Sequence, residues 1–261
     1  MNILAIGDIV GRSGRRAVKS LLPQIIADYY IDFIIANGEN ASGGRGLNRD
    51  SMDELLTAGI NVITMGNHVW QNKDIFNFID QQPELIRPCN YPDVCQGQGY
   101  HIYTTENHIR IAVINASGRV FMESLDCPFK KVTGILDEIH DNADIIIVDI
   151  HAEATSEKLA FGYYFDGRVS AVLGTHTHVQ TADERILPQG TAYITDLGMT
   201  GPVHSILGMD TNMVIKKFLT QQPVRLEVSK GEAQLQGVVL KTSLDNKKAT
   251  EIIRLSVRHT L

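Results

Sequence analysis

The stretch INVITMGNHVW, residues 60–70, decides how the chain folds. Its apolar run, Val62 to Met65, is short and rich in β-branched residues and stops at Gly66, which is the pattern of a buried strand. Open α/β sheets bind their ligands just beyond the carboxyl ends of the strands. We therefore expect this strand to present Asn67 and His68 at a binding site.

Four other apolar runs end in polar residues of the same kinds. Residues 2–6 precede Asp8, residues 33–37 precede Glu39 and Asn40, residues 145–150 precede His151, and residues 169–173 precede His176 and His178. A strand that only fills a core does not need such an ending. Its repetition indicates that these strands share one site.

The segments between the strands are expected to be helical. Apolar spacing predicts helices over residues 15–29, 48–58, 74–80 and 132–140, and one helical turn over 156–161. Later connections are shorter, which favours antiparallel strands over 100–104, 109–114, 191–195, 234–242 and 250–258, with a turn at 245–248 and an edge segment at 85–88. We expect one α/β domain over residues 1–261, built from two sheets with helices outside.

The composition narrows the class of protein. The 261 residues are 43% hydrophobic, which suffices for a large core, and the formal net charge is −6. No basic run is present, so we expect no stable binding of nucleic acid. No apolar run approaches the roughly 18 residues of a membrane span. The three cysteines lack Cys-x-x-Cys spacing, so a reducing, cytoplasmic location is the simplest expectation.

The polar residues at the strand ends have the chemistry of a metal site. They are Asp8, Glu39, Asn40, Asn67, His68, His151, His176 and His178. Carboxylates, amide oxygens and imidazoles without thiolates suit Mn, Fe or Zn. So many groups exceed one tetrahedral site but fit two neighbouring ions, with Glu39 as the natural bridge. His176 and His178 are two residues apart, so in an extended segment both rings would face one centre.

The charge of such a site favours an anionic substrate. Two divalent ions bring four positive charges, of which Asp8, Glu39 and a bridging hydroxide remove three. The net positive site would attract a phosphoester, and paired metals lower the pKa of a bound water to about 7. Taken singly, each residue has a simpler explanation, since Asp8 could cap a helix and a lone histidine is usually a core or surface residue. Taken together, the strand-end histidines favour a site.

These motifs resemble those of the calcineurin-like metallophosphoesterases. The matching residues are Gly7-Asp8, Gly38-Glu39-Asn40, Gly66-Asn67-His68, His151, and the run from Gly174 to His178. The bacterial YmdB-type subfamily is a closer match, over residues 2–11, 37–41, 151–155 and 166–201. That subfamily also has Glu39 where the superfamily usually has aspartate, and Asp8-Ile9-Val10 in place of the usual Asp-x-His.

The resemblance implies a four-layer α/β/β/α sandwich that binds two divalent ions, often iron or manganese. By motif, one ion would be held by Asp8, Glu39, Asn40 and His178, and the other by Glu39, Asn67, His151 and His176. His68 would stay unliganded, close to the leaving-group oxygen. The implied activity is hydrolysis of small phosphodiesters, with 2′,3′-cyclic nucleotides as the substrate class. A metal-bound hydroxide would attack phosphorus, and His68 would act as the general acid.

Other interpretations remain open at this point. The substrate could be a phosphomonoester, or the chain could be a regulatory metal-binding protein with little catalysis. Arg45, in the glycine-rich loop 41–46, could meet a phosphate, and Tyr163 or Tyr164 could stack on a base, although turn and packing roles are more common. The oligomeric state is open, a homo-oligomer included.

Overall fold

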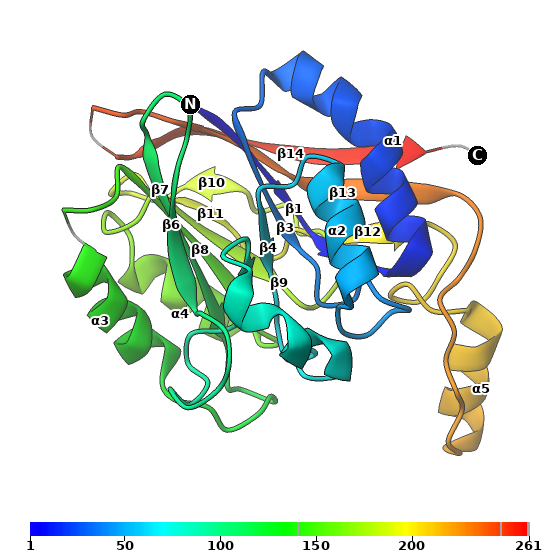
Figure 1. Cartoon of the computed structure of the whole chain (residues 1–261). Helices are drawn as coiled ribbons and strands as arrows, with labels where there is room; N and C mark the ends of the chain where they lie inside the picture. The colour runs from blue at the N-terminus through cyan, green and yellow to red at the C-terminus, as the bar shows by residue number, and fades with distance from the viewer. Residues whose placement is uncertain (140, 246, 260–261) are drawn as a thin grey trace.

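The computed structural model describes residues 1–139, 141–245 and 247–259, which form two mixed β-sheets with helices around them (Figure 1). His140, at the end of the expected helix 132–140, and Asn246, in the expected turn 245–248, lie outside the described residues. The α/β class predicted from the sequence is confirmed.

The larger sheet has eight strands in the order β2-β12-β13-β1-β3-β4-β5, with β14 also paired to β13. Its strands are β1 (Asn2–Ile6), β2 (Asp8–Ile9), β3 (Phe33–Asn37), β4 (Val62–Thr64), β5 (Leu85–Ile86), β12 (Met199–Pro202), β13 (Ala233–Thr242) and β14 (Ala249–His259). Strands β1, β3, β4 and β5 run parallel to one another, so the polar residues that follow them gather at one edge.

The smaller sheet has six strands in the order β10-β11-β9-β8-β7-β6. Its strands are β6 (Tyr100–Thr104), β7 (Arg110–Ser117), β8 (Ile145–His151), β9 (Ala171–Thr175), β10 (Arg185–Ile186) and β11 (Ala192–Ile194). As expected, β6 and β7 form an antiparallel hairpin. The prediction for residues 191–195 was wrong in direction, because β11 pairs in parallel with β9 and is antiparallel only to the two-residue β10.

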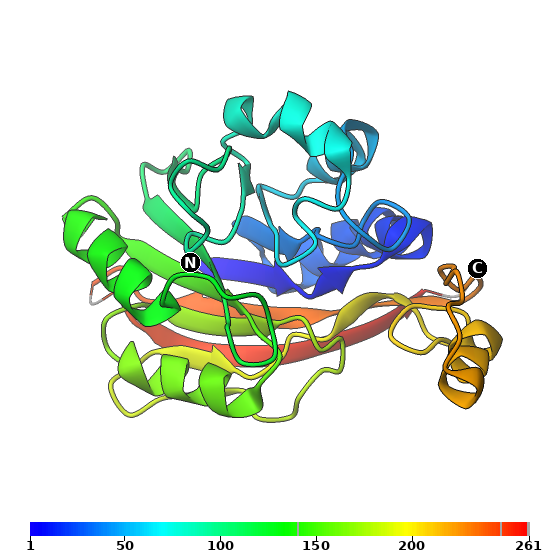
Figure 2. The same ribbon diagram turned by 90° about the horizontal axis from the view of Figure 1, so that it is seen from below.

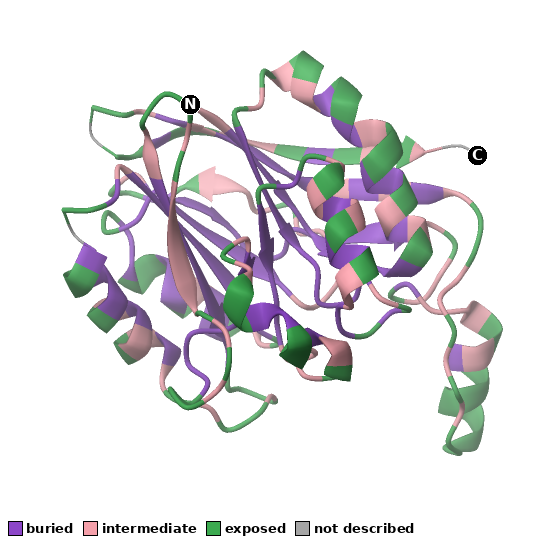
Figure 3. Ribbon diagram, viewed as in Figure 1, coloured by how far each residue is buried: buried purple, intermediate pink, exposed green. Residues whose placement is uncertain are grey.

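Three apolar clusters separate four layers. Helices α1 (Gly11–Tyr29) and α2 (Arg49–Thr57) pack on one face of the larger sheet through residues such as Leu22 and Leu55. Helices α3 (Pro128–Ile139) and α4 (Thr155–Tyr164) cover the smaller sheet through residues such as Val132 and Phe161. Ile35 and Ile147 belong to the cluster between the two sheets, which lie stacked in the middle of the molecule (Figure 2). Figure 3 shows the strands largely buried, whereas α5 (Thr211–Thr220) projects with a mostly exposed surface.

Several helix boundaries differ from the sequence predictions. Helix α1 begins at Gly11 rather than Arg15, because its glycines serve packing: a Cβ on Gly14 would lie 2.3 Å from the Thr200 carbonyl oxygen. The expected helix 74–80 is two 3-10 helices, η1 (Lys73–Asn77) and η2 (Ile79–Gln81). They are separated by Phe78, which has a non-helical φ of −142° and a side chain buried in the core. Helix α4 spans ten residues rather than one turn. The sequence analysis did not predict β2, β10, β12 or α5.

Candidate metal centre

Every strand-end residue named from the sequence lies at the edge where the strands of the two sheets end. Asp8, Glu39, Asn40 and His151 are at most 2% exposed, so the centre is built from buried polar groups. Buried polar groups of this density are costly unless they are paired or bind an ion. The structure therefore brings together side chains whose burial requires partners.

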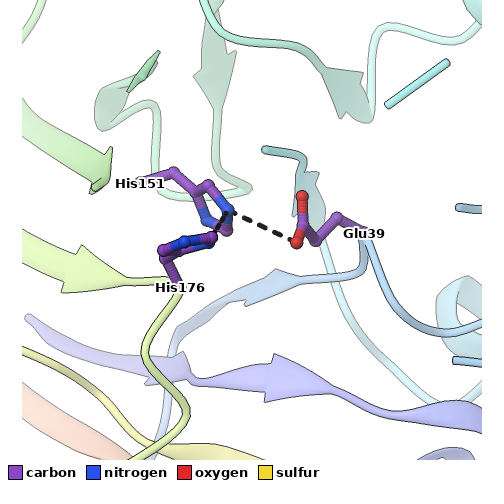
Figure 4. Close-up of side chains that lie close together, drawn as sticks. All are labelled: Glu39, His151 and His176. Atoms are coloured by element: carbon purple, nitrogen blue, oxygen red, sulfur yellow. Dashed lines mark hydrogen bonds and ion pairs between the residues drawn. The ribbon is translucent and has the colours of Figure 1, made fainter. Parts of the chain in front are cut away.

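Glu39, His151 and His176 form one group of side chains (Figure 4). The Oε1 atom of Glu39 lies 3.3 Å from His151 Nε2, and that nitrogen lies 3.0 Å from His176 Nδ1. Asn67 Oδ1 is also 3.0 Å from His151 Nε2. The ligand atoms of Glu39 and the two histidines lie within 4.8 Å of one another, a spacing that could hold one metal ion.

A second group lies on the other side of Glu39. Asn40 Nδ2 donates a hydrogen bond of 3.1 Å to Glu39 Oε1 and lies 3.2 Å from His178 Nε2. His178 Nε2 lies in turn 3.6 Å from Asp8 Oδ1. Glu39 thus contacts side chains of both groups, and Asp8 Oδ2 reaches the first group only through the backbone N–H of His176, at 3.1 Å.

The sequence analysis expected the rings of His176 and His178 to face one centre from an extended segment. In the structure the two rings belong to different ligand groups. The segment is not extended, since φ is +100° at His176 and +64° at His178. Both values lie in the left-handed region, which reverses the chain direction locally. His176 consequently joins His151, and His178 joins Asp8 and Asn40.

His68 lies at the rim of the centre, with a side chain that is 26% exposed. Its backbone N–H donates to Glu39 Oε2 at 2.9 Å, and its Nδ1 lies 2.7 Å from Asn40 Oδ1. Among the described residues, no side chain or carbonyl makes a hydrogen bond to His68 Nε2. That nitrogen is the one polar atom of the ring left to meet a ligand.

Residues outside the sequence prediction fix the histidine rings. His151 Nδ1 lies 2.9 Å from Thr175 Oγ1, and Thr175 donates its hydroxyl proton to Asp149 Oδ1 at 2.7 Å. Because the hydroxyl hydrogen is already engaged, Thr175 accepts from His151 Nδ1–H, and Nε2 is the nitrogen that faces Glu39 and would bind a cation after losing its proton. Asp149 is a charged residue inside an otherwise apolar strand, and this signal could have identified it.

The other two histidines are oriented in the same manner. His178 Nδ1 donates to the Leu207 carbonyl oxygen at 3.2 Å, so that its Nε2 faces Asp8 and Asn40. His176 turns the opposite nitrogen inward, because its Nε2 lies 3.0 Å from Glu153 Oε2. Outer partners of this kind set the tautomer of metal-binding histidines.

Asp196 and Lys158 hold the loop between the two histidines. Asp196 Oδ2 accepts from the backbone N–H of Thr177 at 3.0 Å and from its hydroxyl at 2.7 Å. Lys158 Nζ donates to the same oxygen at 2.8 Å, and both charged side chains are at most 1% exposed. Asp196 follows strand β11 as Asp8 follows β1, so the strand-end pattern could have revealed it.

The electrostatics keep both site carboxylates ionised. Burial raises the pKa of Asp8 and of Glu39, but the neighbouring histidines, chiefly His178 beside Asp8 and His151 beside Glu39, outweigh it, so that both pKa values fall below their usual range. His151 shows the reverse balance, since burial opposes its charged form but Glu39 and Asp8 raise its pKa to about 9. Burial, followed by the charge of His151, lowers the pKa of His176 to about 4.

The structure offers its own test of whether these residues fit a cation. Asp8 Oδ1 is fully buried and accepts no hydrogen bond from any described residue, which leaves a carboxylate oxygen without a donor. A Cβ on Gly66 would lie 2.3 Å from His151 Nε2 and 2.4 Å from Glu39 Oε2, so only glycine permits this close approach. Oxygen and imidazole groups crowded around an unpartnered carboxylate fit divalent cations.

Three residues considered for substrate binding make no hydrogen bond or ring contact to the centre among the described residues. Tyr163 and Tyr164 lie on α4, where they are 56% and 51% exposed, and Tyr164 packs against Phe129 and Phe165. Arg45 is exposed in its glycine-rich loop, where its backbone N–H donates to the Ser42 carbonyl oxygen. These contacts favour the packing and turn roles.

No helix among the described residues is long and apolar enough to cross a lipid bilayer.

Known proteins share both the sequence and the fold. A Bacillus subtilis protein named 2′,3′-cyclic-nucleotide 2′-phosphodiesterase is 51% identical over 257 residues, which cover 98% of this chain and 97% of that protein. A crystal structure of a Thermus thermophilus protein superposes with a TM-score of 0.93 at 40% identity, over 99% of both chains. The crystal structure of a Mycoplasma pneumoniae phosphatase gives the same TM-score at 36% identity, over 99% of this chain and 93% of that one.

These likenesses confirm the metallophosphoesterase type of α/β/β/α sandwich expected from the sequence, and the resemblance drawn from the strand-end motifs is confirmed as well. A sequence model of the YmdB-like protein family matches residues 4–255, and the chain belongs to that family.

Proposed function

We propose that the chain is a metal-dependent phosphodiesterase that hydrolyses 2′,3′-cyclic nucleotides. The observation that carries the proposal is the position of Glu39, whose carboxylate touches two separate groups of potential ligands. The name of the Bacillus subtilis relative supports the substrate class. The same name supports cleavage of the bond between phosphorus and the 2′ oxygen, which would release a nucleoside 3′-phosphate.

Seven side chains would hold two divalent ions, with iron or manganese as the preferred pair and zinc as the alternative. Asp8, Glu39, Asn40 and His178 would hold one ion, and Glu39, Asn67, His151 and His176 would hold the other. When bound, such ions lower the pKa of a coordinated water and stabilise negative charge on phosphoryl oxygens. The unpartnered Oδ1 of Asp8 supports the first group, and the close packing of His151 against His176 supports the second.

Asn40 links the metal centre to His68. In the structure its amide nitrogen faces Glu39 and His178, and its oxygen faces His68 Nδ1. A cation needs the oxygen on the inner side, and the two ends of an amide exchange when the side chain rotates. Glu39 Oε1, which lies 3.2 Å from His68 Nδ1, would then accept from Nδ1–H, so that His68 can release a proton from Nε2 and keep the one on Nδ1.

His68 is proposed as the general acid. Its Nε2 is free of partners among the described residues, and the side chain is partly exposed at the rim. A proton on this nitrogen can pass to the departing ribose oxygen, while Glu39 and Asn40 hold the ring in place from the inner side. Positioned proton donors of this kind contribute typically ~10²- to 10⁴-fold to a rate.

We also propose that residues 1–261 form one domain. Ile3 and Ile35 of the larger sheet and Val113 and Ile147 of the smaller sheet share one buried apolar cluster. A cluster of this kind lets the two sheets fold as one unit, which supports this boundary.

The experiment is turnover of 2′,3′-cyclic AMP by protein loaded without oxygen with iron or with manganese, with metal counted per chain in the same sample. We expect about two ions per chain and adenosine 3′-phosphate as the product. Adenosine 2′-phosphate would show that the other P–O bond breaks. Two bound ions with no turnover of this diester, but turnover of a chromogenic monoester, would overturn the proposal in favour of a phosphatase.

A further inference from the structure

The loop of residues 118–127 begins beside the metal centre. It follows strand β7, which lies beside strand β8 (Figure 1). The last residue of β7, Ser117, pairs in register with His151 on β8. The N–H of Gly118 donates to the His151 carbonyl oxygen at 2.9 Å. The first residues of the loop are therefore fixed to the strand that carries His151.

The buried side chain of Asn90 ties the two ends of this loop together. Its Oδ1 accepts from the N–H of Ser117 at 2.9 Å, and its Nδ2 donates to the carbonyl oxygens of Ser117 at 2.9 Å and Asp126 at 3.0 Å. Asn90 is 0% exposed, so these bonds do not compete with water. The loop thus has fixed ends rather than free ones.

A buried carboxylate fixes the backbone of the loop just after Gly118. Glu157, which is 9% exposed on α4, accepts from the N–H of Arg119 at 3.0 Å and from that of Val120 at 3.1 Å. A Cβ on Gly118 would lie 2.6 Å from Glu157 Oε2, so glycine is needed for this contact. Hydrogen bonds to a buried charged group are among the stronger ones in proteins. The backbone of the loop is therefore held by the chain's own side chains up to its tip.

The tip of this ordered loop is apolar and exposed. Val120 is 42% exposed and Phe121 is 90% exposed. Phe121 also has a φ of +61°, a conformation that costs free energy for a residue with a bulky side chain. An ordered loop that holds a phenyl ring in water offers a preformed surface for a flat, apolar ligand.

The loop is linked to the metal centre on the side of His176. Met122 Sδ accepts from the N–H of Glu153 at 3.3 Å, and Glu153 Oε2 lies 3.0 Å from His176 Nε2. Phe121 precedes Met122 in the chain, and Met122 is connected through Glu153 to the proposed metal ligand His176. A molecule whose phosphate lies at Glu39 and whose other end is a planar ring can extend towards this tip.

We propose that Phe121, flanked by Val120, is the platform on which the nucleobase of the substrate stacks. The inference rests on the proposed function, because it takes the substrate to be a nucleotide with its cyclic phosphate at the metal centre. Stacking on an aromatic side chain accepts every base, since each base has a π-face. The platform therefore recognises a nucleobase as a class and contributes to binding rather than to bond cleavage.

The test compares a substrate that has a base with one that lacks it. The two substrates are 2′,3′-cyclic AMP and the 2′,3′-cyclic phosphate of methyl riboside, and the variants are Phe121→Ala and Phe121→Trp. Phe218→Ala is the matched control, because Phe218 is 70% exposed on α5, which projects from the body of the molecule. Metal content per chain is measured for each protein.

With Phe121→Ala we expect the KM for 2′,3′-cyclic AMP to rise about tenfold, within the roughly 5- to 150-fold that the loss of one stacked base represents. The KM for the base-free substrate, kcat for both substrates and the metal content should stay within twofold. Phe121→Trp should restore the wild-type KM, and Phe218→Ala should leave it unchanged.

Three outcomes would overturn the inference, and they differ from failure of the proposed function. An unchanged KM with Phe121→Ala would show that the base lies elsewhere. An equal loss on both substrates, or a loss of metal, would show that the ring supports the centre instead of the base. If the wild-type protein hydrolysed neither substrate, the proposed function would fail and the stacking role with it.

Discussion

The carboxylate of Asp196 accepts both the backbone N–H and the side-chain hydroxyl of Thr177, the residue between the two histidines of the metal centre. His176 and His178 both have positive φ values, and such conformations cost of order 1–3 kcal/mol each for residues other than glycine. The paired hydrogen bonds from Thr177, together with the Lys158 ammonium on the same oxygen, hold this turn in place. Because of this turn, the ring of His176 lies in one ligand group and the ring of His178 lies in the other.

Replacement of Lys158 by methionine should destabilise the whole protein. The variant Lys158→Met leaves the Asp196 carboxylate buried without its counter-charge, and breaking a buried ion pair by removing one partner costs about 3–5 kcal/mol. Urea denaturation at neutral pH measures the free energy of unfolding. Lys241→Met, which breaks an ion pair exposed at both ends, is the control and should change that free energy by less than ~1 kcal/mol. A loss in Lys158→Met no larger than in the control would contradict the assigned role of this pair.

Replacement of Thr175 by valine should weaken metal binding more than it weakens the fold. The variant removes the hydroxyl that accepts from His151 Nδ1–H, so the ring is free to place its proton on the nitrogen that faces Glu39. Loss of an outer partner of a metal-binding histidine typically costs ~10- to 100-fold in metal affinity. Calorimetric titration with Mn²⁺ measures this loss. Thr220→Val, on the exposed end of α5, should bind Mn²⁺ as the wild type does, and equal affinities in all three proteins would refute the role of Thr175.

Replacement of His68 by glutamine should slow turnover while the metals stay bound. Glutamine keeps a polar group beside Asn40 but cannot donate a proton as an acid, so we expect kcat for 2′,3′-cyclic AMP to fall ~10²- to 10⁴-fold. Metal analysis of the same sample should give the wild-type content. His204→Gln is the control, since the His204 side chain is 81% exposed and lies outside the centre. Full activity of His68→Gln would rule out the general-acid role, and loss of metal would make His68 a ligand instead.

The strand-end residues were predictable because parallel strands deliver their carboxyl ends to one edge. Three apolar runs were enough to locate Glu39 after β3, Asn67 after β4 and His151 at the end of β8. The pairing of these strands follows from the fold class. To predict the hydrogen bond between Thr175 and Asp149, one must know the register of β8 and β9. In that register Asp149 pairs with Leu173, and His151 pairs with Thr175. Register is a tertiary property, so single-sequence reasoning missed this pair.

The remaining differences between sequence and structure have local physical causes. The turn at His176 and His178 is held by the hydrogen bonds between Thr177 and Asp196, which lies 18 or more residues from either histidine in the sequence, so the segment could not be recognised as a turn. The early start of α1 depends on close contact between Gly14 and Thr200, whereas the sequence alone favoured a loop at two glycines. In both cases a distant contact overrides the local preference.

Stability at low pH should depend on Asp144. Its carboxylate accepts hydrogen bonds from the side chain and from the backbone N–H of Arg110. These bonds, the side-chain one above all, lower the pKa of Asp144 from 3.8 to about 2. A lowered pKa in the folded state means that the stabilisation is complete above the ordinary pKa and is lost as the pH falls through about 2. Because the two side chains are 40% and 32% exposed, solvent screening reduces the contribution to about 1 kcal/mol.

Asp144→Asn should therefore unfold more easily than the wild type at pH 6 by about 1 kcal/mol, and the difference should shrink between pH 4 and pH 2. Urea denaturation at a series of pH values, with metal removed, measures the difference. Asp137→Asn, an exposed change on α3, is the matched control. A difference that stayed constant down to pH 2 would show that Asp144 stabilises the fold by shape rather than by charge.

Replacement of Gly66 by alanine should destroy the metal centre. The added Cβ would lie 2.3 Å from His151 Nε2 and 2.4 Å from Glu39 Oε2, so these two buried side chains must move apart. Overpacking of a dense site costs typically 1–3 kcal/mol, and we expect Mn²⁺ affinity to fall at least ~10-fold because the shared carboxylate is displaced. Calorimetric titration and urea denaturation measure the two effects. Gly134→Ala is the opposite case: Gly134 lies in α3 with no atom within 4 Å of the added Cβ, so alanine should stabilise the helix by roughly 0.5–1 kcal/mol and leave metal binding unchanged. If Gly66→Ala bound Mn²⁺ as tightly as Gly134→Ala, then Glu39 and His151 would not need their observed approach, and the shared role of Glu39 would be wrong.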